Sequence, residues 1–148
     1  MTFRKALACG YALALFIFPC LALAANLVWD GNSIPLPLSD QAGNYLRGKE
    51  IVNSRQTGLC VLCHSIPENQ ARFEANLAPN LADSVGQLSS AQLRARLVDA
   101  SRFNPNTIMP NYYQTNGLSR VAPQFANKTI LSAQEIEDVI AYLKTLSP

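Results

Sequence analysis

Residues 60–64 of this 148-residue chain read Cys60-Val61-Leu62-Cys63-His64, and the other features of the sequence are best understood from them. A C-x-x-C-H run in an exported chain is typical of covalent haem c attachment, in which two thiols bond the porphyrin vinyl groups and the adjacent imidazole binds iron. Two residues between the thiols let them reach neighbouring pyrroles while the next side chain turns under the iron. We therefore expect Cys60 and Cys63 to hold one haem c and His64 to be its first axial ligand.

Two other sites would use the same pair of thiols: a redox-active dithiol and half of a zinc site. A redox dithiol of the thioredoxin type lies within a βαβ unit, and no βαβ pattern flanks this motif. Zinc expects four ligands, whereas the chain contains a single His and no Cys after Cys63. Both alternatives are therefore less favoured than haem attachment.

The first 24 residues have the pattern of a secretory signal peptide. A basic start, residues 1–5, precedes an almost wholly apolar run from Ala6 to Leu21. The triplet Ala22-Leu23-Ala24 then supplies the small-x-small pattern of a cleavage site. The apolar run is also long enough for an uncleaved membrane anchor, although the cleavage triplet favours removal. We expect a periplasmic mature chain that begins at Ala25.

Removal of residues 1–24 changes the charge and the cysteine inventory. Arg4 and Lys5 leave, so 10 of the 12 basic residues remain against 10 acidic residues, and the formal charge becomes zero. Nucleic-acid binding needs a basic stripe, which a neutral chain with scattered charges lacks. Cys9 and Cys20 also lie in the removed segment. The remaining length of about 124 residues suits one domain.

Residues 25–38 are expected to form an extended N-terminal arm. Pro35 and Pro37 remove backbone donors and favour extended geometry. The apolar side chains of the arm, with Trp29 among them, pack either on the parent domain or on a partner. Packing on the parent domain is favoured because exposed apolar runs are avoided unless they are binding sites.

Helical periodicity predicts a first helix over residues 40–56, capped by Ser39. Gly48 lies inside it and costs about 1 kcal/mol relative to Ala, so we expect another helix to approach closely there. The apolar positions assigned to the core are Tyr45, Leu46, Ile51 and Val52.

Two capping-box patterns predict two further helices. Ser132–Glu135 begins the C-terminal helix, on which Tyr142 is placed to lie over Gly48. Ser89–Gln92 begins a middle helix that runs to about Ala100. The apolar positions of the C-terminal helix are Ile136, Val139, Ile140, Leu143 and Leu146.

Terminal helices that cross at a glycine, with C-x-x-C-H just after the first, resemble the small cytochromes c. The resemblance implies a mostly α, class I-type cytochrome c fold over residues 39–148, with N- and C-terminal helices crossing and loops wrapping one haem. The loop-rich stretches are residues 65–88 and 101–131. The first contains Ala78-Pro79-Asn80-Leu81, which resembles the family's Gly-Pro-x-Leu stretch with Ala in place of Gly. That resemblance implies that the Pro79 carbonyl orients the iron-bound imidazole.

The second axial ligand can be predicted by elimination. His64 is the single His, and Met1 leaves with the signal peptide, so Met109 is the remaining thioether. It lies in a loop between Pro105 and Pro110, and proline stiffens a loop that must hold a weak ligand. Alternatively, Met109 fills a core gap and the distal position is open or taken by an amine. His/Met ligation leaves no vacant iron position and indicates one-electron transfer.

From about Ser33 to Leu146 the chain resembles the SoxX family, the monohaem subunits of the SoxAX cytochromes of sulfur-oxidising bacteria. The resemblance implies a haem-bearing SoxA partner in a heterodimer, a SoxYZ carrier whose cysteine is coupled to thiosulfate, and a soluble cytochrome as electron acceptor. The chain would then be the non-catalytic electron-transfer subunit of an L-cysteine S-thiosulfotransferase. The stretches that carry the resemblance are Ile34-Pro35, Gly48–Val52, Cys60–His64, Leu88–Asp99, Asn104–Pro110 and Tyr112–Leu118.

Two other classes of protein remain compatible with the same haem motif. A free-standing monohaem shuttle between respiratory complexes would need no second haem subunit. A haem-based gas sensor would need an open or labile axial position, and therefore a Met109 that does not bind iron.

Overall fold

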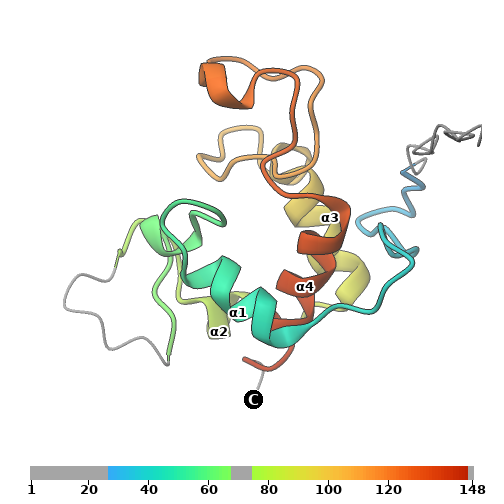
Figure 1. Cartoon of the computed structure of the whole chain (residues 1–148), viewed down its shortest axis with the longest axis vertical. Helices are drawn as coiled ribbons and strands as arrows, with labels where there is room; N and C mark the ends of the chain where they lie inside the picture. Colours follow the sequence, from blue (N-terminus) through green and yellow to red (C-terminus); the bar gives the residue numbers. More distant parts are fainter. Residues whose placement is uncertain (1–26, 68–74, 147–148) are drawn as a thin grey trace, which may run out of the picture.

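The computed structural model describes residues 27–67 and 75–146, which form a mostly α domain (Figure 1). No strand occurs within those ranges, and none of their helices is long and apolar enough to cross a membrane. The expected signal peptide, residues 1–24, lies outside them. The helices are α1 (Tyr45–Asn53), α2 (Leu81–Val85), α3 (Ser90–Val98) and α4 (Ala133–Leu143), with short 3₁₀ turns at Cys60–Leu62, Ala100–Arg102 and Pro123–Phe125.

The crossing of α1 and α4 is the centre of the fold (Figure 1). A Cβ atom on Gly48 would overlap the Asp138 carbonyl and press on the Cβ of Tyr142. The close approach expected at Gly48, with Tyr142 above it, is therefore confirmed. Gly43 makes a second such approach, to the Glu137 carbonyl one residue earlier on α4, which the sequence analysis did not identify.

The predicted helix starts are correct for α3 and α4. Ser89 with Gln92 and Ser132 with Glu135 form complete capping boxes, so each pair satisfies backbone donors at its helix start. The middle helix ends at Val98, two residues before the predicted end.

The prediction for α1 was wrong at both ends and on its exposed face. Asn44, not Ser39, caps the helix, because the Asn44 side chain accepts from the backbone N–H groups of Leu46 and Arg47. The Ser39 hydroxyl instead donates to Gln134. The helix therefore has nine residues and stops at Asn53. Its buried face consists of Gly48, Ile51 and Val52, whereas Tyr45 and Leu46 are more than half exposed.

The N-terminal arm packs on its own domain through a buried ion pair. Ile34 and Leu38 are buried. Arg94 on α3 donates twice to the Glu137 carboxylate on α4, at 2.7 and 2.8 Å, and once to the Ile34 carbonyl at 2.7 Å. The Leu38 N–H donates to the same carboxylate at 2.9 Å. Every charge of the pair thus has several partners, which a buried ion pair needs to offset its desolvation.

The stretch 65–88, expected to be loop-rich, contains the short helix α2. Asn80 caps it by accepting from the Ala82 N–H at 2.9 Å. Pro79 thus lies immediately before a helix cap, which fixes the backbone that carries its carbonyl group.

Candidate functional site

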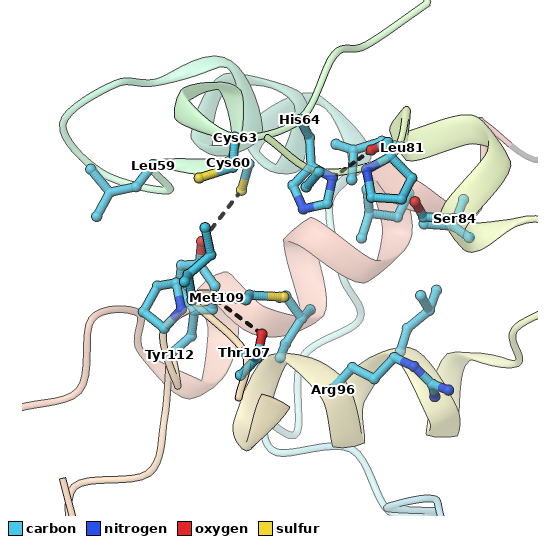
Figure 2. Close-up of a pocket in the computed structure, with 18 of the residues that line it drawn as sticks. Leu59, Cys60, Cys63, His64, Leu81, Ser84, Arg96, Thr107, Met109 and Tyr112 are labelled. Carbon is cyan, nitrogen blue, oxygen red and sulfur yellow. Dashed lines mark hydrogen bonds between the residues drawn. The ribbon is translucent and has the colours of Figure 1, made fainter. Parts of the chain in front are cut away.

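A cavity of about 450 Å³ opens between the C-x-x-C-H segment and the loop that carries Met109 (Figure 2). This volume lies within the range of about 300–1,000 Å³ that is usual for cofactor sites. Most of the lining is apolar. It is drawn from α1, residues 59–64, residues 77–88, α3, residues 104–112 and the end of α4.

The motif segment presents both thiols to this cavity. Leu59 adopts a left-handed conformation with φ of 61°, which turns the chain into the 3₁₀ turn at Cys60–Leu62. The backbone N–H of Cys63 donates to the Cys60 carbonyl at 3.1 Å and closes this turn, and the N–H of His64 donates to the same carbonyl at 2.9 Å. Cys60 and Cys63 are not joined in a disulfide, and both line the cavity. Burial raises the pKa of the Cys60 thiol above its ordinary value.

The His64 imidazole is held by the backbone of the next segment. Its Nδ1 lies 2.7 Å from the Pro79 carbonyl oxygen. A carbonyl can only accept, so Nδ1 carries the hydrogen and Nε2 keeps the lone pair that a metal needs. The hydrogen bond that the Gly-Pro-x-Leu resemblance implied is thus present, with Ala78 in place of glycine. The Ala78 N–H donates to the Cys63 carbonyl and the Leu81 N–H to the Ser65 carbonyl, at 2.9 and 3.0 Å.

Met109 faces His64 from the opposite wall. Figure 2 shows the thioether and the imidazole extending into the same space from segments on opposite sides. Met109 is half-buried, and its N–H donates to the Thr107 hydroxyl at 3.1 Å. The four residues singled out from the sequence, Cys60, Cys63, His64 and Met109, are therefore brought together around one cavity.

Tyr112 joins the two walls, and the sequence analysis gave it no role. Its buried hydroxyl donates to the Gly58 carbonyl at 2.7 Å and lies 3.8 Å from the Cys60 sulfur. Burial raises the pKa of Tyr112 well above the ordinary tyrosine value, so the hydroxyl stays a donor. Its backbone N–H donates to the Leu97 carbonyl at 2.9 Å. The sequence feature that could have pointed to this role is the aromatic residue three positions after the predicted ligand Met109.

The residue set fits a covalently bound haem. Two free thiols lie beside each other, an imidazole with its outer nitrogen engaged follows them directly, and a thioether stands across an apolar cavity. These are the groups by which c-type haem is attached and ligated.

Comparisons with known proteins agree with this site. The family model described as cytochrome c matches residues 45–147. A chain in the crystal structure of SoxXA from P. pantotrophus is similar to this one, with a TM-score of 0.73 and 32% sequence identity. The match covers 82% of this chain and 95% of that chain. No curated protein sequence gives a significant match.

Proposed function

Because the chain belongs to the cytochrome c family, as a SoxX-type monohaem cytochrome with a covalently attached haem c, we propose that it is the electron-transfer subunit of a SoxAX-type heterodimer. The heterodimer would oxidatively couple thiosulfate to a cysteine of a SoxYZ carrier. A soluble cytochrome would then accept the electrons. We place the complex in the periplasm, with residues 1–24 removed as a signal peptide and the mature chain starting at Ala25.

We assign four residues to the haem. Cys60 and Cys63 would form the two thioethers, and His64 and Met109 would be the axial ligands. The observation that carries this assignment is the placement of His64 and Met109 on opposite walls of one cavity (Figure 2). The haem supplies reversible acceptance of one electron. Around it, the Pro79 carbonyl fixes the ring orientation of His64, and Tyr112 ties the Met109 wall to the motif segment.

Electron counting assigns the sulfur chemistry to another subunit. Joining thiosulfate to a cysteine thiol releases two electrons, whereas one haem accepts one. Once Cys60 and Cys63 are thioethers, the chain proposed to begin at Ala25 has no thiol left to react. His64 and Met109 would also fill both axial positions, so the anion would have no iron site to bind. This subunit would therefore relay electrons from a haem-bearing partner.

An apolar surface beside the cavity supports docking of such a partner. Leu77 and Ile108 line the cavity, yet they are 68% and 73% exposed. Leu62, between the two motif cysteines, is also exposed. Exposed apolar side chains can serve as interaction sites, and a partner that bound here would have its haem close to the cavity.

Reconstitution tests the proposed function. The purified holoprotein would be mixed with thiosulfate, the carrier protein and an oxidised cytochrome, with and without the second haem subunit. We expect no thiosulfate-dependent reduction without the second subunit and sustained turnover with it. Turnover by this subunit alone would overturn the assignment. If no second haem subunit co-purifies or restores activity, a free-standing shuttle is the better description.

A further inference from the structure

We propose that Arg96 binds a haem propionate and so forms a carboxylate site at the end of the cavity opposite Cys60 and Cys63. This inference rests on the haem attachment and ligands proposed above. It concerns a different group of the haem from those held by the four residues already assigned.

The position of the propionates follows from the pattern of haem substituents. The two vinyl-bearing pyrroles are neighbours, and the two propionate-bearing pyrroles lie across the ring from them. Thioethers to Cys60 and Cys63 would hold the vinyl edge on their side of the cavity. Figure 2 shows Ser84 and the Arg96 guanidinium on the other side from these sulfurs, and both residues line the cavity. The propionate edge would therefore point toward α2 and α3.

Arg96 lies in the lining, and among the described residues it has no acidic partner. Its guanidinium stacks on the Phe103 ring, with 4.7 Å between Cζ and the ring centroid. It also donates a long hydrogen bond of 3.4 Å to the Gln92 carbonyl. No carboxylate within residues 27–67 and 75–146 forms an ion pair with it. Arg94, two residues earlier on the same helix, is by contrast saturated by Glu137. Arg96 is thus a half-buried cation that retains donors for an anion.

Ser84 and Lys144 are less suited than Arg96 to hold the propionate. The Ser84 hydroxyl already donates to the Asn80 carbonyl at 2.8 Å. Lys144 donates to the Leu88 carbonyl at 3.0 Å and does not line the cavity. Arg96 is the one Lys or Arg in the described lining. A guanidinium can also bind a carboxylate through two parallel hydrogen bonds.

An aromatic stack holds Arg96 in place and supplies a matched control. The ring centroids of Phe103 and Trp29, a residue of the arm, are 6.4 Å apart. The Cζ atom of Arg102 lies 4.3 Å from the centroid of the Trp29 ring. Arg96 and Arg102 therefore make the same kind of contact with one aromatic pair. Arg102 is exposed and does not line the cavity, so replacing it tests the stack without changing the charge at the cavity wall.

The proposed contact predicts an effect on the haem itself. A propionate carries a negative charge, which favours ferric over ferrous iron. A guanidinium paired with it offsets that charge at short range, where the interaction is strong in a partly buried site. Removing the guanidinium should therefore stabilise the ferric state and lower the reduction potential.

Three holoprotein variants test the site: Arg96→Gln, Arg96→Lys and Arg102→Gln. Each would be measured by equilibrium redox titration and by resonance Raman spectroscopy of the propionate bending band. We expect Arg96→Gln to shift the propionate band and to lower the ferrous-to-ferric ratio at fixed ambient potential several-fold. Arg96→Lys should leave the reduction potential close to the wild-type value but shift the propionate band. The positive charge remains, whereas the parallel N–H donors of the guanidinium are lost. Arg102→Gln should match the wild type in both measurements.

The outcomes separate this inference from the ligand assignment. An unchanged propionate band in Arg96→Gln would overturn the proposal, as would an equal shift in Arg102→Gln. If Arg96→Gln does not fold, an unchanged band in Arg96→Lys overturns it equally. The weak red-edge absorption of Fe–S(thioether) coordination should persist in all three variants. Its absence from the wild type would instead refute Met109 as ligand.

Discussion

The two walls of the haem cavity are held in different ways. On the His64 wall, backbone bonds from residues 78–81 reach back to residues 63–65, and the imidazole itself bonds the Pro79 carbonyl. On the Met109 wall the bonds are local: the Met109 N–H donates to the Thr107 hydroxyl, and the N–H groups of residues 106 and 107 donate to Asn104. The adjacent Ile108 is 73% exposed. The anchor of that wall is Tyr112, whose hydroxyl reaches Gly58.

If His64 and Met109 are the axial ligands, as proposed, this difference explains how one small domain would hold a strong and a weak ligand. The imidazole is oriented by its own hydrogen bond, so its position is fixed whatever the distal side does. The thioether has no such bond, and it depends on how the loop is tied to the rest of the fold. We therefore expect changes on the His64 wall to act on haem binding and changes on the Met109 wall to act on ligation and potential.

The largest effect should come from His64→Ala. Without the imidazole the haem loses its oriented ligand next to the thioether bonds, and we expect most holoprotein to be lost. The measurement is haem absorbance per polypeptide after purification of the exported protein. Wild-type haem content with a low-spin spectrum in this variant would show that another residue replaces His64 and would contradict the assignment.

The next effect should come from Met109→Ala, which leaves the His64 wall intact. Haem content should stay near the wild-type value, because both cysteines and the imidazole remain. The red-edge absorption of Fe–S(thioether) coordination should disappear, and the reduction potential should fall because thioether ligation favours ferrous iron. Optical spectra and a redox titration measure both effects. Persistence of the band would mean that Met109 is not the ligand.

Much of the fold could be predicted because its decisive signals are local. The capping boxes at Ser89 and Ser132 satisfy backbone donors within one turn, so the pattern fixes the helix start wherever the helix packs. Gly48 was also informative, since glycine inside a helix needs a close neighbour. The cap of α1 was missed because Ser39 and Asn44 are both good caps, and the contact between Ser39 and Gln134, 95 residues away, decides between them.

The site could be predicted where its residue types are rare. Once residues 1–24 are removed, as proposed, one His and one Met remain for the two proposed axial positions, and the structure places both at one cavity. Tyr112 and Arg96 could not be selected in this way, because tyrosines and arginines are more common in the chain. Their roles arise from contacts between segments distant in sequence, such as Tyr112 with Gly58 and Phe103 with Trp29. Periodicity carries no information about such pairs.

Tyr112→Phe should have an intermediate effect, through the anchor of the Met109 wall. The change leaves the buried Gly58 carbonyl without the tyrosine donor, which should lower the free energy of unfolding by about 1–3 kcal/mol. Haem content should not change, whereas the red-edge band should weaken at lower denaturant concentration than in the wild type. Denaturant unfolding of both proteins, followed by the absorbance of the red-edge band, provides the measurement. Identical midpoints in the two proteins would show that the hydroxyl does not anchor this wall.

The same residue predicts a dependence on alkaline pH. Burial raises the pKa of Tyr112 in the folded state, whereas the unfolded chain titrates near the ordinary value of about 10. Above that pH the unfolded state binds fewer protons than the folded state, so the free energy of unfolding falls as pH rises. Tyr112→Phe should lack this contribution. The stability difference between the two proteins should therefore narrow as pH rises above about 10.

The smallest effects should come from Thr107→Val and Asn80→Ala, one on each wall. Thr107→Val removes the acceptor of the Met109 N–H in a part-buried bond of 3.1 Å, so stability should fall by about 1 kcal/mol. Asn80→Ala removes the cap of α2 and the bond to Ser65, which should cost about 1 kcal/mol. The two variants should therefore lose similar amounts of free energy of unfolding.

The two variants should differ in how fast an external ligand replaces the thioether. Exogenous imidazole can bind the oxidised iron after Met109 leaves, so its binding rate reports how firmly the loop is held. Thr107→Val should raise that rate several-fold because the Met109 N–H loses its bond, whereas Asn80→Ala should leave it at the wild-type value. Stopped-flow absorbance gives both rates directly. If Asn80→Ala raises the rate as much as Thr107→Val does, the two walls are coupled, and the independence of His64 from the distal loop is refuted.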